Sequence, residues 1–116
     1  MTAGSGRLRR SDRLRSSKDF RRLSREGDRR SSRHFVALLA PALEAAPEDT
    51  PRLGITVSRK VGNAVTRNRV KRGIREWFRC HRDALAAQQD VVVIARRGAG
   101  ELTGAEVRRE LRELFA

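Results

Sequence analysis

The sequence predicts a single α+β domain, a two-layer α/β sandwich in which three helices cover one mixed sheet of about four strands. Three observations lead to this prediction. Residues 53–57 alternate apolar with small or polar side chains, as in a half-buried strand. Residues 90–95 are a β-branched run typical of a buried strand. A long amphipathic helix is predicted between them, so the three segments form a β-α-β unit.

The N-terminal part is predicted to be a tail followed by a short helix. Residues 1–15 show no apolar pattern and are rich in Gly, Ser and Arg, so we expect a disordered basic tail. The folded domain is then expected to span residues 16–116. Ser16 or Ser17 can cap a short helix that ends by Gly27.

The first half of the sheet is predicted from residues 34–40, HFVALLA, which are almost continuously apolar. Such a run suits a strand that is covered on both faces. A short edge strand is expected just before it, at residues 29–32. Residues 41–51 contain all three prolines and are expected to be a loop, and the alternating strand of residues 52–58 follows.

The central helix is predicted over residues 63–85, with Asn63 as its N-cap because the side-chain oxygen can accept a hydrogen bond from a first-turn N–H. At about 100° per residue, an apolar face separates from a basic one. The apolar face consists of Val70, Ile74, Trp77, Phe78, His81 and Leu85. The other face, here called the basic stripe, consists of Asn68, Lys71, Arg72, Arg75, Arg79 and Arg82.

The last helix is predicted to begin at Thr103, which forms a capping box with Glu106. Leu102 and Val107 are placed to form the accompanying hydrophobic staple. The buried face of this helix is expected to consist of Val107, Leu111, Leu114 and Phe115.

The positive charge is concentrated on part of the chain. The 116 residues contain 27 Lys and Arg against 14 Asp and Glu, for a net charge of +13. Residues 58–82 contribute +8 and residues 1–33 another +8, while the remainder is slightly acidic. This asymmetry indicates a domain with one basic side and a nucleic-acid partner.

The basic stripe has few counter-charges. A surface made only for solubility mixes signs, whereas the stripe offers only the pairs Arg72–Glu76 and Arg79–Asp83. We therefore favour a phosphate backbone as its partner over a purely solvated surface.

No constellation for catalysis by the protein is found. His81 is expected to be a packed ring, and His34 has no obvious carboxylate partner. The single Cys80 permits no internal disulfide and no zinc site, and it is expected to be a structural thiol beside the apolar face. Two-metal phosphodiester cleavage needs converging carboxylates, so another molecule would have to hold the metals. No segment is apolar enough for a membrane span or a secretory signal, which predicts a cytoplasmic location.

Residues 60–75, KVGNAVTRNRVKRGIR, closely resemble the signature of the bacterial ribonuclease P protein subunit. Its Arg-Asn-Arg core corresponds to residues 67–69. Asp19-Phe20 on the first helix and the segments 53–58 and 93–96 agree with that family in the same order. The resemblance covers residues 14–115.

The resemblance implies a fold and a division of labour. In the ribonuclease P protein family the β-α-β crossover is the rare left-handed kind, so the resemblance implies that hand for this chain. The sequence pattern alone favours a right-handed crossover. The protein would dock on a catalytic RNA and bind the 5′ leader of precursor tRNA during endonucleolytic 5′ maturation. Catalysis would reside in the RNA, and Mg²⁺ would be held mainly by the RNA and the substrate, none by the protein alone. No membrane and no protein partner would be required.

Two sets of site residues follow from the resemblance. The set expected to bind the RNA subunit is Asn63, Arg67, Asn68, Arg69, Lys71, Arg72 and Arg75. The set expected to bind the leader is Phe20, with Val36 and Leu38 on an open sheet face, and Arg59, Lys60 and Arg96. The three cations would converge if the strands that they follow are parallel neighbours.

Some alternatives stay open. Phe20 is either a core anchor or a ring exposed in the leader cleft. Many relatives have an aromatic residue where this chain has Ser24 and Leu38, so leader binding would depend on Phe20 and the cations. A ribosomal or nucleoid protein that only coats nucleic acid is the competing function, and missing carboxylates disfavour an autonomous nuclease.

Overall fold

The computed structural model describes residues 17–41, 52–81 and 89–116. Four strands form one mixed sheet in the order β1-β2-β4-β3. These are β1 (Asp28–Ser31), β2 (Phe35–Pro41), β4 (Gln89–Ala95) and β3 (Arg52–Val57). β2 pairs antiparallel with both β1 and β4, whereas β3 and β4 are parallel. The predicted mixed sheet of four strands, including its short edge strand, is confirmed.

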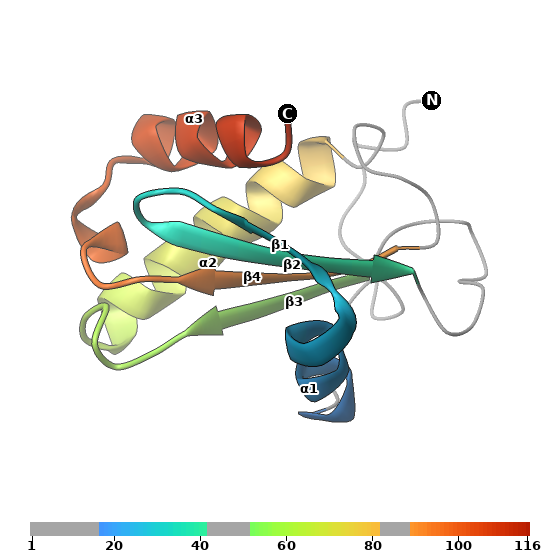
Figure 1. Cartoon of the computed structure of the whole chain (residues 1–116). Coiled ribbons are helices and arrows are strands. Elements are labelled where there is room, and N and C mark those ends of the chain that lie inside the picture. The colour runs from blue at the N-terminus through green and yellow to red at the C-terminus, as the bar shows by residue number, and fades with distance from the viewer. Residues whose placement is uncertain (1–16, 42–51, 82–88) are drawn as a thin grey trace.

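The helices cover both faces of this sheet (Figure 1). α1 (Ser17–Glu26) lies on one face, in front of the sheet in this view. α2 (Ala64–Cys80) crosses the opposite face, and α3 (Gly104–Leu114) packs beside it. A short 3₁₀ helix, η4 (Ala99–Glu101), joins β4 to α3. The α+β class and the three helices agree with the prediction.

The β3-α2-β4 connection is left-handed. In Figure 1 both strands point to the left, β4 lies above β3, and α2 crosses behind them. Nearly all such crossovers are right-handed because of strand twist. The hand that the family resemblance implied is therefore confirmed.

The main core lies between the sheet and the pair α2 and α3. Alternate residues of β2 point into it, because successive side chains of a strand face opposite sides. α2 contributes the apolar face predicted from its 3.6-residue period, and α3 contributes the residues expected for it. The buried helical residues are Val70, Ile74, Trp77, Phe78, Val107, Leu111 and Leu114.

A smaller apolar cluster lies on the opposite face of the sheet, beneath α1. Leu23 of α1 is fully buried there against Val36, Leu38 and Ala40 of β2 and Val92 of β4. Val36 and Leu38 are each only 5% exposed. The prediction that they lie on an open sheet face is wrong, because α1 places Leu23 over them.

A buried ion pair also fixes α1 to the sheet. The guanidinium of Arg22 contacts the carboxylate of Asp90, which is fully buried, and Arg22 Nη1 donates to the Pro41 carbonyl oxygen at 3.1 Å. Removing a charge from water is expensive unless a partner and hydrogen bonds compensate for it. The pair therefore ties the position of α1 to the start of β4.

The predicted helix caps are present, although α2 is shorter than expected. Asn63 Oδ1 accepts a hydrogen bond from the Thr66 N–H at 2.9 Å, and the capping box of Thr103 and Glu106 forms as predicted. α2 ends at Cys80, so the predicted end at residue 85 is not observed. Residues 1–16 and 82–88, with the expected tail and with Arg82, Asp83 and Leu85, lie outside the described residues.

Candidate nucleic-acid interface

The basic stripe lies along α2 on the side away from the core. Asn68, Arg72 and Arg75 are exposed, and Lys71 and Arg79 are half-buried. At 1.5 Å of rise per residue, the segment from residue 68 to residue 79 is about 17 Å long. The stripe is thus a straight row of cations on a rigid helix, which suits contact with the phosphates of a polyanion.

One cation of the stripe is paired within the helix. Glu76 accepts hydrogen bonds from Arg79, including one from Nε at 3.3 Å, rather than from Arg72 as the sequence suggested. Residues three and four apart are both neighbours on a helix surface, so either partner was possible. The hydrogen bond from Arg79 also lowers the pKa of Glu76. Within the described residues, Lys71 and Arg72 form no such ion pair.

The two arginines of the Arg-Asn-Arg core lie close to the fold. The Arg69 guanidinium donates to the carbonyl oxygen of Gly100 in η4. A Cβ at Gly100 would lie 2.6 Å from Thr66 Cγ2, so this close approach of η4 to α2 requires glycine. Arg67 is half-buried, and its Nε is buried without a hydrogen-bond partner among the described residues. Part of this predicted docking set therefore also supports the fold.

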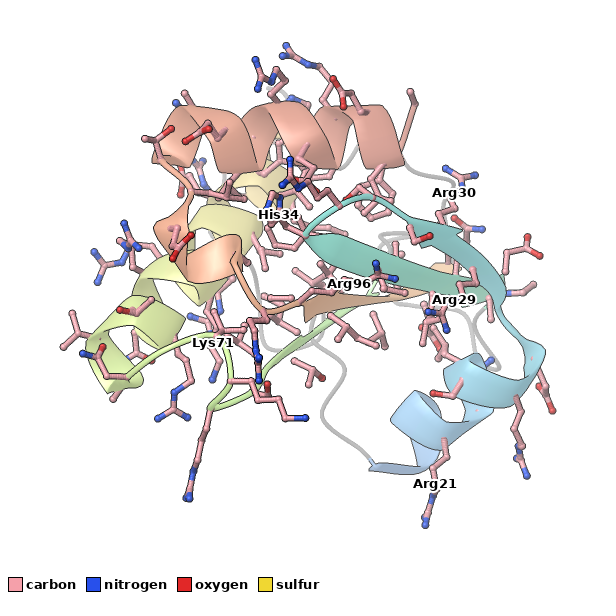
Figure 2. The ribbon with its side chains drawn as sticks, turned by 60° about the vertical axis from the view of Figure 1, so that its left-hand side comes forward. Arg21, Arg29, Arg30, His34, Lys71 and Arg96 are labelled. Atoms are coloured by element: carbon pink, nitrogen blue, oxygen red, sulfur yellow. The ribbon has the colours of Figure 1, made fainter. Side chains whose placement is uncertain are left out.

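Three further cations lie just beyond one end of the sheet. Val57 pairs with Ala95 where parallel strands β3 and β4 end. Arg59 and Lys60 follow β3 and Arg96 follows β4, and all three are exposed. The condition set for their convergence, parallel neighbouring strands, is therefore met. Figure 2 shows Arg96 projecting from this part of the molecule.

The positive surface extends beyond the residues predicted as site residues. Arg21 on α1 and Arg29 and Arg30 on β1 are exposed and lie in the right-hand part of Figure 2, and Arg29 and Arg30, as successive strand residues, face opposite sides of the sheet. No motif contains them, so only the excess charge of residues 1–33 could have indicated this surface.

Comparison with known proteins shows the family of this chain. A family model described as Ribonuclease P matches residues 8–116. The chain belongs to the bacterial ribonuclease P protein family.

Relatives and solved structures of the ribonuclease P protein family match nearly the whole chain. The ribonuclease P protein component of Desulforapulum autotrophicum is 44% identical over 112 residues, which cover 97% of this chain and 92% of that protein. The Staphylococcus aureus RNase P protein structure at 2.0 Å has a TM-score of 0.81 at 38% identity, covering 89% and 91% of the two chains. The Thermotoga maritima RNase P protein has a TM-score of 0.77 at 36% identity, covering 89% and 94%.

The leader set implied by the ribonuclease P family is only partly accessible. The cations Arg59, Lys60 and Arg96 are exposed, whereas Val36 and Leu38 are buried. Phe20 belongs to α1, but its side chain lies outside the described residues. Its role as a core anchor or a leader contact therefore stays a prediction.

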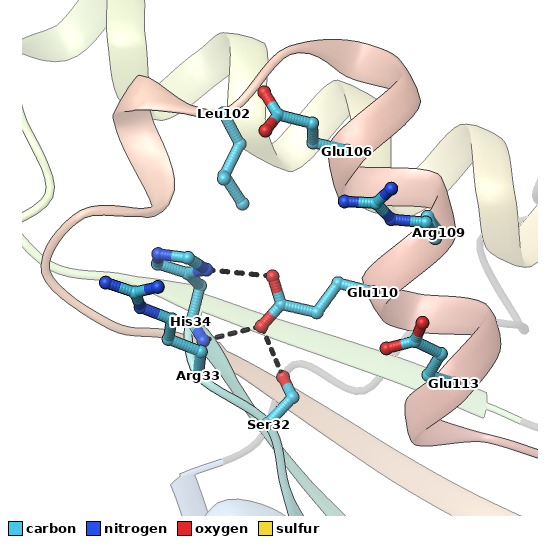
Figure 3. Close-up of a pocket in the computed structure, with 8 residues that line it drawn as sticks. All are labelled: Ser32, Arg33, His34, Leu102, Glu106, Arg109, Glu110 and Glu113. Carbon is cyan, nitrogen blue, oxygen red and sulfur yellow. Dashed lines mark hydrogen bonds and ion pairs between the residues drawn. The ribbon is translucent and has the colours of Figure 1, made fainter.

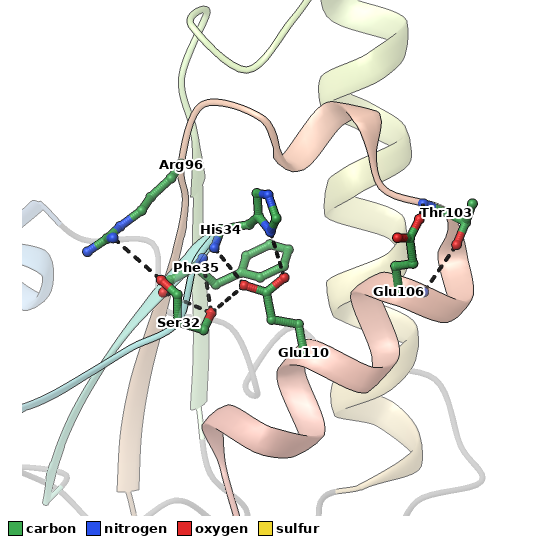
Figure 4. A network of polar contacts seen from close by, with 7 residues as sticks. All are labelled: Ser32, His34, Phe35, Arg96, Thr103, Glu106 and Glu110. Atoms are coloured by element: carbon green, nitrogen blue, oxygen red, sulfur yellow. Dashed lines mark hydrogen bonds and ion pairs between the residues drawn. The ribbon is translucent and has the colours of Figure 1, made fainter.

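His34 has a carboxylate partner, which corrects the prediction that it had none. Glu110 Oε1 accepts hydrogen bonds from the Ser32 hydroxyl and the His34 backbone N–H, each at 2.6 Å, and Oε2 lies 2.8 Å from His34 Nδ1 (Figure 3). The two residues are 76 positions apart in sequence. Figure 4 shows that the network also involves Phe35 and Arg96 through Ser32.

This network holds α3 against the turn between β1 and β2. Burial raises the pKa of Glu110, but the hydrogen bonds from Ser32 and His34 outweigh it and lower that pKa below the ordinary value of 4.5. A carboxyl whose pKa is depressed by folding stabilises the protein above its unfolded-state pKa. This contribution is lost as the pH falls below about 4.5 and through the depressed value. Glu110 thus has a structural role.

Cys80 is exposed at the last residue of α2, and its expected role as a structural rather than a reactive thiol stays a prediction. Among the described residues, no group of three or more His, Cys, Asp or Glu side chains could hold a metal ion. None of the helices described is long and apolar enough to cross a membrane.

Proposed function

We propose that this chain is the protein subunit of ribonuclease P, an endoribonuclease of tRNA 5′ processing, and that α2 docks it on the catalytic RNA. Membership of the family supports the assignment. The observation that carries the docking role is the basic stripe, which faces away from the core on α2 from residue 68 to residue 79. The docking set is Asn63, Arg67, Asn68, Arg69, Lys71, Arg72 and Arg75.

The members of this set would contribute differently. Arg72 and Arg75 are exposed at the centre of the stripe and would bind phosphates directly, as a guanidinium does well with its planar fork. Asn63 and Arg69 already bond within the fold, so they would position the first turn of α2 as well as contact RNA. Mg²⁺ would be held mainly by the RNA and the substrate, and the protein would contribute no catalytic residue.

We propose further that the 5′ leader of precursor tRNA binds beside the end of β3 and β4. Arg59, Lys60 and Arg96 would bind its phosphates, and Phe20 would contact its bases. Because Val36 and Leu38 are buried under α1, they would support this surface rather than contact the leader. A cytoplasmic location fits this work on precursor tRNA.

The docking role is tested by the salt dependence of binding to a bacterial ribonuclease P RNA. Each phosphate contact releases condensed counterions, so about five contacts make log K fall against log salt with a slope steeper than about −3. Titrations at several KCl concentrations measure the slope. A slope near −1 would mean that the stripe is a solvated surface.

The leader role is tested by Phe20→Ala. If the ring stacks on a leader base, affinity for precursor tRNA falls by about 1–3 kcal/mol, while affinity for mature tRNA, which lacks a leader, stays unchanged. Binding of both RNAs to the reconstituted holoenzyme measures this difference.

Leu23→Ala is the matched control, because Leu23 lies on the same helix and is fully buried. Leu23→Ala is expected to lower the free energy of unfolding by about 2–5 kcal/mol. Its effect on affinity should be the same for precursor tRNA and mature tRNA. If Phe20→Ala lowers the affinity for precursor tRNA and mature tRNA equally, and lowers stability as much as Leu23→Ala does, Phe20 belongs to the core.

A further inference from the structure

A pocket lies between the C-terminal end of α2 and α3, away from both predicted sets of site residues. Its volume is about 260 Å³, and it is lined by Trp77, His81, Ala105, Arg108, Arg109 and Arg112. The pockets that hold drug-sized ligands measure about 300–1,000 Å³. The volume lies slightly below this range, so the pocket suits part of a nucleotide, such as its base, with the phosphate at the rim.

One wall of the pocket is the end of a stack of three rings. Trp77 lies between His81, at 4.6 Å between ring centroids and 10° between planes, and Phe115, at 5.1 Å and 22°. Trp77 is only 3% exposed, whereas His81 is half-buried and forms the outer end of the stack. An aromatic stack with an accessible outer ring is a surface on which a nucleobase can stack.

A hydrogen bond fixes the orientation of this outer ring. His81 Nδ1 lies 2.7 Å from the carbonyl oxygen of Trp77, and because a carbonyl only accepts, Nδ1 carries the proton. The ring is thereby held nearly parallel to the indole. A stacking partner would meet a surface that is already ordered, which reduces the entropy lost on binding.

The other wall is a face of α3 that carries three arginines. Ala105, Arg108, Arg109 and Arg112 have the i, i+3, i+4, i+7 spacing of one helix face. In the part of the chain that the structure describes, neither Arg108 nor Arg112 forms a hydrogen bond or an ion pair, whereas Arg109 interacts electrostatically with Glu106. The methyl group of Ala105 leaves room between the arginines and the rings.

We infer that this pocket binds an unpaired nucleotide of an RNA partner. The base would stack on His81 and continue the three-ring stack, and the phosphate would bind Arg108 and Arg112. The inference rests on the proposed function, since it requires an RNA partner. It adds a contact on the side of α2 opposite the basic stripe. A stacking surface next to unpaired guanidinium groups favours a nucleotide over an acidic peptide, which offers charge without a base.

Trp77 makes this pocket directly observable. It is the only tryptophan and the chain has no tyrosine, so the intrinsic fluorescence of the protein reports on this stack. We expect adenosine 5′-monophosphate to quench the emission of the full chain in a saturable way, with a Kd of about 1 mM. Ribose 5-phosphate and a tetraglutamate peptide, which have no base, should leave the emission unchanged.

Variants separate the pocket from general charge. The double variant Arg108→Ala with Arg112→Ala should lower the affinity for the nucleotide by about tenfold or more. Ala105→Leu should prevent nucleotide binding by filling the pocket. The control Arg21→Ala with Arg29→Ala removes the same charge from exposed positions elsewhere and should bind normally. Thermal melts establish that each variant is folded.

The inference would be overturned by an absence of quenching, by equal affinity of the two double variants, or by equal binding of ribose 5-phosphate or the peptide. Arg72→Ala with Arg75→Ala should leave the nucleotide affinity unchanged. If the nucleotide does not bind but the protein assembles normally with ribonuclease P RNA, only the pocket is rejected. If the nucleotide binds but assembly fails, only the docking role is rejected.

Discussion

Replacing Arg72 and Arg75 together by alanine is expected to weaken the binding of ribonuclease P RNA by about 3–6 kcal/mol, since each charge-assisted contact contributes about 1.5–3 kcal/mol. Both side chains are exposed on α2, outside the core. The fold should therefore stay intact. Equilibrium binding at one fixed salt concentration measures the loss of affinity.

An effect on docking can be distinguished from an effect on catalysis by saturating the RNA with the Arg72→Ala, Arg75→Ala variant. Cleavage of precursor tRNA should then proceed at close to the normal rate, because the proposed role of the stripe is only to hold the subunit on the RNA. Arg21→Ala with Arg29→Ala is the control of equal charge and should lose less affinity. A severely depressed rate at saturation would show that the stripe takes part beyond docking.

Asp90→Ala is expected to lower the free energy of unfolding by about 3–5 kcal/mol, because it leaves a buried guanidinium without its counter-charge. Arg22 is only 9% exposed and is held by Asp90 and the Pro41 carbonyl. So large a loss is a substantial part of the stability of a small domain. Urea denaturation of the variant and the wild type measures it.

The double variant Arg22→Met with Asp90→Leu distinguishes a lost partner from a lost contact. Replacing a whole buried pair by apolar residues of similar size is often neutral or stabilising. The double variant should therefore be clearly more stable than Asp90→Ala. A loss below about 1 kcal/mol for Asp90→Ala would instead place the pair among surface ion pairs.

Features that depend on local sequence could be predicted. The period of 3.6 residues placed Val70, Ile74 and Trp77 on the buried face of α2, and it placed the basic stripe opposite them. The caps at Asn63 and Thr103 were also predictable, because each bonds to an N–H only three residues away.

Features that depend on contacts distant in sequence could not be predicted. Arg22 and Asp90 are 68 residues apart, and nothing in either neighbourhood indicates the other. The continuous apolar run of β2 shows that both faces of this strand are apolar, but not that Leu23 covers Val36 and Leu38. The hand of the crossover came from the family resemblance, since strand twist alone favours the opposite hand.

Reconstitution with a bacterial ribonuclease P RNA tests the proposed function most directly. Cleavage of a precursor tRNA is measured at a Mg²⁺ concentration too low for the RNA to act well alone, with RNA, protein or both. If the cations of the protein serve docking and leader binding as proposed, we expect efficient cleavage at the mature 5′ end only with both. Cleavage by the protein alone, or a rate of the RNA that the protein leaves unchanged, would contradict the assignment.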